Sequence, residues 1–206
     1  MSIIHLSSAS LPPHSYKEIA RYMKVDTTNN ETKALIDKCI QECDKQISAK
    51  IVYKEFQISC VGDMLDLGFT ATKSNDIKKL LLNNNCTSII LFAATLGIGI
   101  DRLLLKYSRT SPATALCIQA IGAERVEALC NAFSLELKEK FAPLGRSLTP
   151  RFSPGYGDLP LSLQRDIFAA LECEKHLGLT LNDSLLMSPT KSVTAIIGIK
   201  NNKDNI

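Results

Sequence analysis

The chain has 206 residues, of which 45% are hydrophobic and 22% charged, and its formal net charge is +3. These values are ordinary for a globular protein, and the small, evenly spread charge argues against nucleic acid as a partner. The longest apolar runs, at 88–96 and 193–199, are far shorter than the ~20 residues of a membrane-spanning helix, so no membrane association is expected. Seven cysteines without a secretory signal pattern favour free thiols in a reducing compartment, and hence a cytoplasmic protein.

The first part of the chain predicts helices followed by a short hairpin. Apolar residues at helical spacing indicate helices over 15–23 and 30–48. Residues 50–60 are rich in β-branched and aromatic side chains and predict a strand, with 63–68 as a hairpin arm. Ser74 is positioned to cap a helix over 76–82, which the following asparagine run ends.

The second part mixes helices and strands without a regular βαβ rhythm. Gly122 is expected to be a soft point within a long helix, residues 142–160 are expected to form a loop, and the polar tail 201–206 is expected to fray. The predicted elements are a buried strand over 88–94, a helix over 100–108, a helix from Pro112 to about 140, a helix over 161–176, and strands near 179–186 and 192–200.

This pattern predicts an α+β fold with a mostly antiparallel sheet and flanking helices. We expect a single domain over 1–206, with a variable N-terminal part over 1–85, a core over 86–200 and the tail over 201–206. No internal repeat is present.

Two further patterns are weaker than they first look. Gly97 and Gly99 lie between a predicted strand and helix, as in a dinucleotide-binding fingerprint, but Arg102 replaces the third glycine. A tight turn is favoured, and its helix N-terminus could still help hold an anion. Cys39 and Cys43 lie one helical turn apart, but no second pair and no nearby histidine completes a metal site, so buried thiols are favoured.

The segment RFSPGYGD at 151–158 carries the main candidate site. Pro154 restricts φ, and Gly155 reaches backbone angles that let a ligand approach the main chain. Arg151 offers planar paired donors for a carboxylate, and Tyr156 adds a ring face with a hydroxyl. This set suits a small ligand with a carboxylate at one end and a flat ring at the other. A surface turn with an incidental arginine is the alternative.

Four ordered blocks resemble the activation domain of cobalamin-dependent methionine synthase. They are R-x-x-P-G-Y at 151–156, LECEKHLG at 171–178, LNDS at 181–184 and MSPTKSVT at 187–194, the last being similar to the family's M-x-P-x-x-S-V stretch. Their order and approximate spacing agree over 151–199, and 120–137 resembles the long helix that precedes the motif. The whole chain looks most like stand-alone versions of that domain.

The resemblance implies an activation subunit, a methyltransferase component that is inactive alone. Family members bind S-adenosylmethionine, dock over the corrin and permit reductive remethylation of cob(II)alamin, with an electron from flavodoxin or a similar donor. This chain has no D-x-H-x-x-G motif and no cysteine-cluster zinc site, so cobalamin is expected on a separate corrinoid methionine synthase partner. Because the methyl sulfonium is already activated, positioning and electrostatics suffice, and no general acid or base is expected.

The resemblance also assigns ligand contacts residue by residue. Arg151 would grip the methionyl carboxylate. The backbone around Ser153 and Gly155 would contact adenine or ribose, and Tyr156 would bracket the ligand. Glu127, on the long helix, aligns with a family acidic residue near the ligand's cationic end, although a solvated glutamate is the alternative. The expected ligand-binding residues are Glu127, Arg151, Ser153, Pro154, Gly155 and Tyr156.

Other functions stay open at this point. In the family, a further aromatic stretch after the S-V block contributes a ligand-binding tyrosine, for which this sequence has no counterpart up to Ile206. That difference motivates a non-catalytic subunit that caps a corrinoid protein without binding S-adenosylmethionine. Reactivation of another corrinoid methyltransferase is a variant of the first hypothesis. An unrelated S-adenosylmethionine-dependent methyltransferase is disfavoured by the lack of a glycine-rich Rossmann start.

Overall fold

The computed structural model describes residues 4–7, 10–26 and 29–201. Helices and strands alternate irregularly along these residues. In chain order the elements are β1 (His5–Leu6), α1 (Tyr16–Met23), α2 (Asn30–Asp44), β2 (Lys50–Gln57), β3 (Ser59–Val61), β4 (Met64–Asp66), β5 (Ala71–Thr72), α3 (Asn75–Leu82), β6 (Cys86–Thr95), α4 (Gly99–Tyr107), α5 (Pro112–Phe141), the 3-10 helix η1 (Ala142–Leu144), β7 (Arg146–Leu148), α6 (Leu163–Leu171), α7 (Cys173–Leu177), β8 (Thr180–Leu181), β9 (Met187–Ser188) and β10 (Ser192–Asn201).

The main sheet has five strands in the order β1-β2-β6-β10-β7, and every neighbouring pair is antiparallel. Strands β6 and β10 form its centre and are paired from Ser192 opposite Thr95 to Lys200 opposite Cys86. Two smaller antiparallel sheets, β3-β4-β5 and β8-β9, lie outside it. The predicted α+β class with a mostly antiparallel sheet is confirmed.

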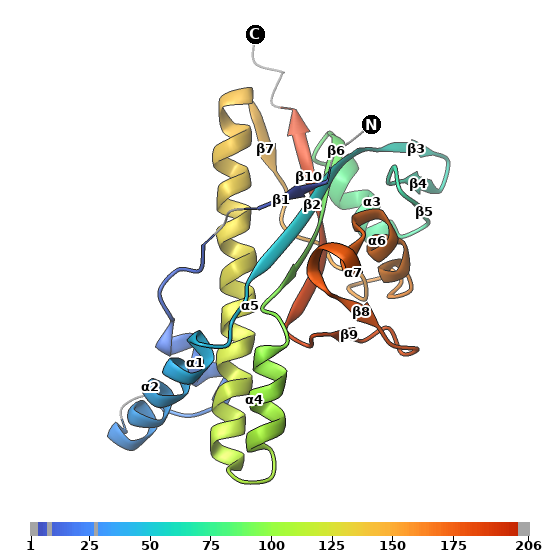
Figure 1. Ribbon diagram of the computed structural model, residues 1–206. Coiled ribbons are helices and arrows are strands. Elements are labelled where there is room, and N and C mark those ends of the chain that lie inside the picture. The colour runs from blue at the N-terminus through green and yellow to red at the C-terminus, as the bar shows by residue number, and fades with distance from the viewer. Residues whose placement is uncertain (1–3, 8–9, 27–28, 202–206) are drawn as a thin grey trace.

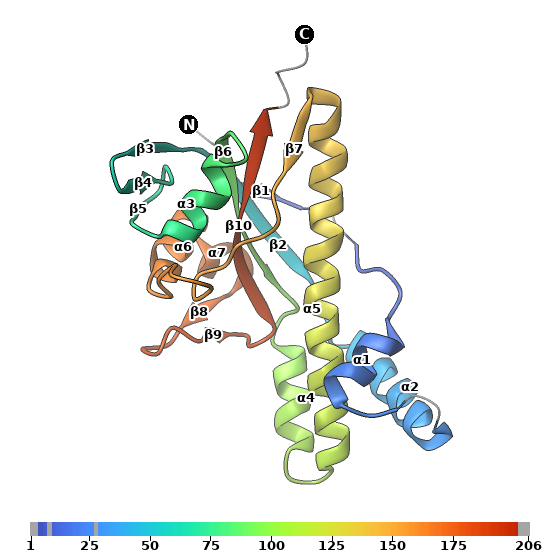
Figure 2. The same cartoon turned by 180° about the vertical axis from the view of Figure 1, so that it is seen from behind.

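Alternate residues of the central strands pack into two hydrophobic cores, one on each face of the sheet. On β6, Phe92 faces α5, where its ring centroid lies 5.0 Å from that of Phe133. Its neighbour Leu91 belongs to the other core, together with Ile167 of α6. Figures 1 and 2 show the same layering, with α5 running along one face of the sheet and α3, α6 and α7 on the other.

Most predicted elements are present, but two expectations are wrong. The helix expected over 161–176 is divided into α6 and α7, because Glu172 adopts a left-handed φ of 47° between them. Gly122 is not a soft point, since α5 continues through it without a break. A Cβ there would lie 2.8 Å from Cε of Lys191, so this glycine makes room on α5 for the side chain of Lys191, which precedes β10.

Other boundaries differ less. The strand expected over 50–60 divides into β2 and β3, and the hairpin arm β4 pairs with β3. The short strands β1, β5, β7 and β9 were not predicted. Helix η1 and strand β7 occupy the first part of the loop expected over 142–160, and the strand expected near 179–186 is limited to β8. Of the tail, residues 202–206 lie outside the described residues. The division into 1–85, 86–200 and 201–206 stays a prediction, although β2 from the first part lies beside β6 from the second.

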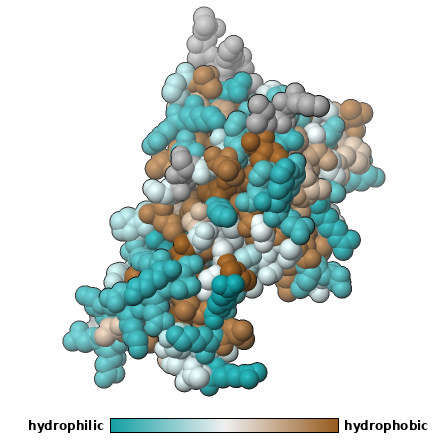
Figure 3. Space-filling model, viewed as in Figure 1, coloured by the Kyte–Doolittle hydropathy of each residue, from teal (hydrophilic) through white to brown (hydrophobic). Residues whose placement is uncertain are grey.

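The surface seen in Figure 3 is mainly hydrophilic over α1 and α2, while hydrophobic side chains gather in the upper middle of the view. Within the parts of the chain that the structure describes, no helix combines the length and the apolar character needed to cross a membrane.

A buried ion pair on α5 holds the segment that precedes α1. Arg125 is only 2% exposed, and its Nε donates to Glu124 at 2.6 Å. The same guanidinium donates to the carbonyl oxygens of Pro12 at 2.7 Å and Pro13 at 3.2 Å. Burial alone would raise the pKa of Glu124, but the neighbouring His14, the hydrogen bonds from Arg125 and the charge of Arg125 outweigh it and lower the pKa to about 2.

We predict that Arg125→Met lowers the free energy of unfolding by about 3–5 kcal/mol, because it leaves the buried Glu124 carboxylate without its cation. Urea unfolding measures this loss. Arg21→Met is the matched control, since Arg21 pairs with Glu18 on the exposed surface, and it should leave the midpoint nearly unchanged. Equal effects of the two substitutions would contradict the role of the buried pair.

The same pair predicts a specific acid sensitivity. The pKa of Glu124 is lowered from 4.5 to about 2 in the folded protein, so the unfolded state binds its proton more readily. The stability that Glu124 contributes is therefore present above pH ~4.5 and is lost as the pH falls through ~2. In Glu124→Gln, the free energy of unfolding should depend less steeply on pH between these values. The slope should fall by up to the amount that corresponds to the uptake of one proton on unfolding. Urea unfolding at each pH measures this slope.

Candidate functional site

A cleft of about 820 Å³ opens beside the first half of β10. Its walls come from α5, the segment 148–156, the start of α6, β9 and β10. Strand β10 is paired with β6 along its length, but on its other edge it meets β7 only at 199–201 and Phe152 only at Ile196. Among the described residues, no strand pairs with that edge over 192–194. The cleft therefore lies where the edge of β10 is open.

Backbone hydrogen bonds hold the predicted motif against β10. Phe152 N–H donates to Ile196 O at 2.9 Å, and Ile196 N–H donates back to Phe152 O at 2.8 Å. Three residues earlier, Thr149 N–H donates to Gly198 O at 2.9 Å. Arg151 is thus held by two points of attachment to the central sheet, which makes its position well defined.

The turn that follows is fastened to α3. The carboxylate of Asp158 accepts hydrogen bonds from the backbone N–H groups of Asn75 at 2.7 Å and Asp76 at 3.1 Å, and from the hydroxyl of Ser74. It thereby satisfies amides at the N-terminus of that helix. Gly157 has a φ of 52°, and a Cβ on it would lie 2.1 Å from Asp76 Oδ2, so only glycine fits this close approach.

Arg151 and Glu127 are distant in sequence but adjacent in the cleft. Arg151 Nη2 donates to Glu127 Oε2 at 3.1 Å and to Asn131 Oδ1 at 2.9 Å. Glu127 and Asn131 lie one turn apart on α5, so both reach the same guanidinium nitrogen. Because those bonds use both hydrogens of Nη2, a bound carboxylate would meet Nη1 or Nε, or would displace Glu127.

Five of the six predicted site residues line the cleft. The exception is Gly155, which does not line the cleft. It has a φ of 89° and donates its N–H to Leu159 O at 2.9 Å, so it shapes the turn. Tyr156 is 69% exposed at the mouth of the cleft. The residues found in the wall are Glu127, Arg151, Ser153, Pro154 and Tyr156. That they bind a ligand stays a prediction.

Sequence reasoning gave no role to several polar residues of the site, among them Asn131, Gln164 and Thr194. Asn131 gave no signal beyond its place on a long helix, and Gln164 none at all. Thr194 lies at the end of a resembling block but was given no role. Gln164 and Thr194 are 6% and 2% exposed and line the cleft, and Gln164 Oε1 and Thr194 Oγ1 have no hydrogen-bond partner in the described structure. Such atoms are uncommon in folded proteins and require an explanation.

The titratable groups near the cleft do not form a nucleophile or a metal site. Burial raises the pKa of the Cys130 thiol, which lies near Arg151, to about 12, so this thiol is neutral at ordinary pH. In the part of the chain that the structure describes, no group of three or more His, Cys, Asp or Glu residues could hold a metal ion. Cys39 and Cys43 are buried, as expected. The cleft can therefore bind and orient a ligand, chiefly through charge and hydrogen bonds.

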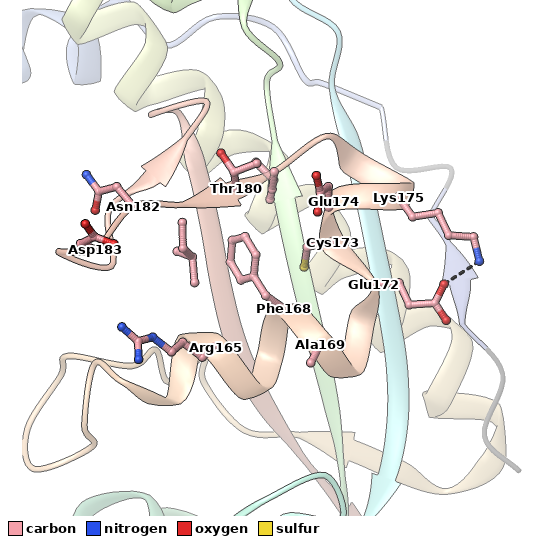
Figure 4. A pocket seen from close by; sticks show the side chains of 12 residues that line it. Arg165, Phe168, Ala169, Glu172, Cys173, Glu174, Lys175, Thr180, Asn182 and Asp183 are labelled. Atoms are coloured by element: carbon pink, nitrogen blue, oxygen red, sulfur yellow. Dashed lines mark hydrogen bonds and ion pairs between the residues drawn. The ribbon is translucent and has the colours of Figure 1, made fainter.

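A second cavity, of about 850 Å³, lies between α6–α7 and the β8–β9 hairpin. In Figure 4, Phe168 points into it, and Arg165 and Asp183 lie at one end. At the other end Lys175 Nζ is paired with Glu172 Oε2 at 2.6 Å. Two of the resembling blocks, 171–178 and 181–184, contribute to this cavity and not to the cleft. No lining side chain presents a buried polar atom without a partner, so the cleft is the stronger candidate site.

The comparison with solved structures supports the fold. No family model and no curated protein matches the chain. A crystal structure of the MetH reactivation domain bound to AdoHcy is similar, with a TM-score of 0.64 and 18% sequence identity, over 90% of this chain and 70% of that one. The chain therefore has the fold of the MetH reactivation domain, and the resemblance predicted from the four sequence blocks is confirmed at the level of the fold.

We predict that Gly157→Ala destabilises the protein more than Gly178→Ala. Both glycines have positive φ, at 52° and 67°, so both alanines are strained in the same way. Only the Cβ at 157 would collide, with the carboxylate of Asp76, while nothing lies within 4 Å of one at 178. Thermal unfolding should show the larger loss for Gly157→Ala, by more than about 1 kcal/mol. Equal losses would mean that the turn is not fastened to α3.

Proposed function

We propose that this protein binds S-adenosylmethionine in the cleft beside β10 and serves as the activation subunit for cobalamin on a separate corrinoid methionine synthase protein. The observation that carries the proposal is the Arg151–Glu127 pair, which Asn131 supports and which lines a cleft of the fold that the MetH reactivation domain shares. The solved reactivation domain has AdoHcy bound, and AdoHcy differs from S-adenosylmethionine only by the transferable methyl group and its charge.

The cluster suits the amino-acid end of such a ligand. An α-amino acid carries a carboxylate and an ammonium on one carbon, and here a guanidinium and a carboxylate lie 3.1 Å apart. The carboxylate of the ligand would bind Arg151, a charge-assisted interaction of about 1.5–3 kcal/mol. The ammonium would bind Glu127, while Asn131 Oδ1 keeps its hydrogen bond from Arg151.

The rest of the cleft fits a nucleoside in size and in chemistry. Its volume of about 820 Å³ lies within the range of small-molecule sites. Phe152, Met187 and Val193 add apolar surface to its walls, and Tyr156 places a ring at the mouth that can cover a bound base.

The proposed reaction requires this chain only to bind and orient the ligand. Cobalamin, held by the partner, would supply the methyl acceptor once a donor such as flavodoxin had reduced it by one electron. The sulfonium sulfur keeps the electron pair of the broken bond and leaves as a neutral thioether, so no proton has to move. The residues of this chain hold the sulfonium ligand and orient its methyl group toward the partner, and Glu127 stabilises its positive charge.

A non-catalytic capping subunit is the second candidate. The observation that favours it is the pairing of Arg151 with Glu127 and Asn131, which satisfies the guanidinium without any ligand. A protein of this kind would dock on a corrinoid protein and bind no S-adenosylmethionine. Measured binding by the isolated protein therefore separates the two functions.

We predict that S-adenosylmethionine raises the melting temperature of the protein and that Arg151→Ala abolishes this shift. At 100 times the dissociation constant, the ligand adds ~2.7 kcal/mol, which corresponds to roughly 5–10 °C for a chain of this size. Lys175→Ala is the control, because Lys175 lines the second cavity, and it should leave the shift unchanged. No shift in the wild-type protein, alone or with a corrinoid partner present, would contradict the proposed function.

A ligand without the amino-acid group tests the assignment of Arg151 itself. We predict that Arg151→Ala weakens binding of S-adenosylhomocysteine at least tenfold, while binding of methylthioadenosine, which lacks the carboxylate and the ammonium, is unchanged. Isothermal titration gives both affinities. Equal losses for the two ligands would show that Arg151 supports the shape of the cleft and does not bind a carboxylate.

A further inference from the structure

Gln164 and Thr194 are the two buried polar side chains of the cleft whose acceptor atoms lack partners. Gln164 is 6% exposed and Thr194 is 2% exposed. Neither Gln164 Oε1 nor Thr194 Oγ1 has a hydrogen-bond partner in the described residues, although both side chains line the cleft. An amide or hydroxyl buried in this way destabilises a protein unless something else completes its hydrogen bonds.

The two side chains lie on the opposite face of the sheet from the Arg151 cluster. On β10, Ala195 and Ile197 belong to the core that α5 covers, whereas Ile196 belongs to the core that α6 covers. Because side chains alternate along a strand, Thr194 faces the same side as Ile196, toward α6. Gln164 is on the first turn of α6. Arg151, by contrast, meets residues of α5.

The cleft therefore has two polar ends separated by the open edge of β10. The charged end, formed by Arg151 and Glu127, suits the amino-acid group of the ligand. The neutral end, formed by Gln164 and Thr194, carries no charge. The acceptor atoms of both side chains are covered in the free protein, so the side chains would turn toward the cleft to bring their amide and hydroxyl groups to a ligand. A ligand that spans the edge of the strand would place a charged group at one end and a neutral hydrogen-bonding group at the other.

We infer that Gln164 recognises the adenine base of the ligand and determines the specificity of the cleft for it, with Thr194 as the second hydrogen-bonding partner at this end. This inference rests on the proposed function, because it takes S-adenosylmethionine as the ligand. A glutamine amide matches adenine in a bidentate way: its oxygen accepts from the exocyclic N6 amino group and its nitrogen donates to N7. Hypoxanthine has an oxygen in place of that amino group, which would face the amide oxygen and repel it.

The neutral end also explains why these atoms are unsatisfied in the free protein. Sites that hydrogen-bond a polar group of a ligand reject analogues that lack it, because their own polar groups are then left unpaired. Removing such a group should stabilise the free protein and weaken the complex. A residue with a purely structural role would change both in the same direction.

The test compares S-adenosylhomocysteine with S-inosylhomocysteine, by isothermal titration, on the wild-type protein and on Gln164→Met. Methionine keeps the approximate length of the side chain and removes both hydrogen-bonding groups. We expect the wild-type protein to favour the adenine ligand by about tenfold or more and the variant to lose most of that preference. Arg151→Ala should weaken both ligands by the same factor and keep the preference.

Thr194→Val provides the second variant, since valine has nearly the same shape as threonine without its hydroxyl. It should bind S-adenosylhomocysteine several-fold more weakly, and both variants should melt at or above the temperature of the wild-type protein without ligand. Lower melting temperatures in both would show that the two side chains have partners in the free protein and would overturn the inference.

The outcomes separate this inference from the proposed function. If the wild-type protein binds S-adenosylhomocysteine but Gln164→Met keeps the full preference for adenine, the base is recognised elsewhere and only the inference fails. If the wild-type protein binds both nucleosides equally, the inference fails in the same way. If it binds neither ligand, alone or with a corrinoid protein, the proposed function fails and the inference fails with it.

Discussion

The unequal pairing of the two edges of β10 is the constraint on which the site depends. One edge is paired with β6 along almost the whole strand, which fixes its position at the centre of the sheet. The other edge is paired only from Ile196 onward, by Phe152, Thr149 and β7. The strand is thereby both rigid and open on one edge over 192–195. The cleft combines a well-defined floor with unoccupied space, which is what a preorganised binding site requires.

Helix α5 connects this cleft with the N-terminal part of the protein. Glu124 and Arg125 bind the segment before α1, and Glu127 and Asn131, within the next two turns, bind Arg151. A shift of α5 would change both sets of contacts together. The buried ion pair therefore stabilises the helix in the position from which it presents a carboxylate and an amide to the cleft, and the N-terminal helices contribute to the site without lining its floor.

The sequence predicted the parts of the fold and the site that depend on local patterns. Alternating and buried apolar runs indicate β6 and β10, because strands and helices differ in periodicity. The glycines and the proline of the 151–158 segment indicate a turn, because their backbone preferences are intrinsic. The irregular mixture of helices and strands predicted the α+β class, and the resemblance of four blocks added the activation-domain fold, which the comparison confirms. These features need no knowledge of which residues meet in space.

The rest depends on contacts between distant residues, which local patterns do not contain. Gly122 was read as a weak point because glycine lowers helix propensity, but its role is to admit the side chain of Lys191. The break at Glu172 needs a left-handed φ at a residue that usually continues a helix. Gln164 and Thr194 become notable only when the structure shows that both are buried without partners. Tertiary packing decided each of these cases.

One measurement tests the central claim, that the cleft beside the open edge of β10 is where S-adenosylmethionine binds. Backbone amide chemical shifts of the isotope-labelled protein, recorded during titration with S-adenosylhomocysteine, report the location of the ligand directly. The account predicts that the largest changes fall on residues 151–156 and 192–194 and on α5 near Glu127. Changes concentrated at 165–183, around the second cavity, or the absence of any change at saturating ligand would contradict it.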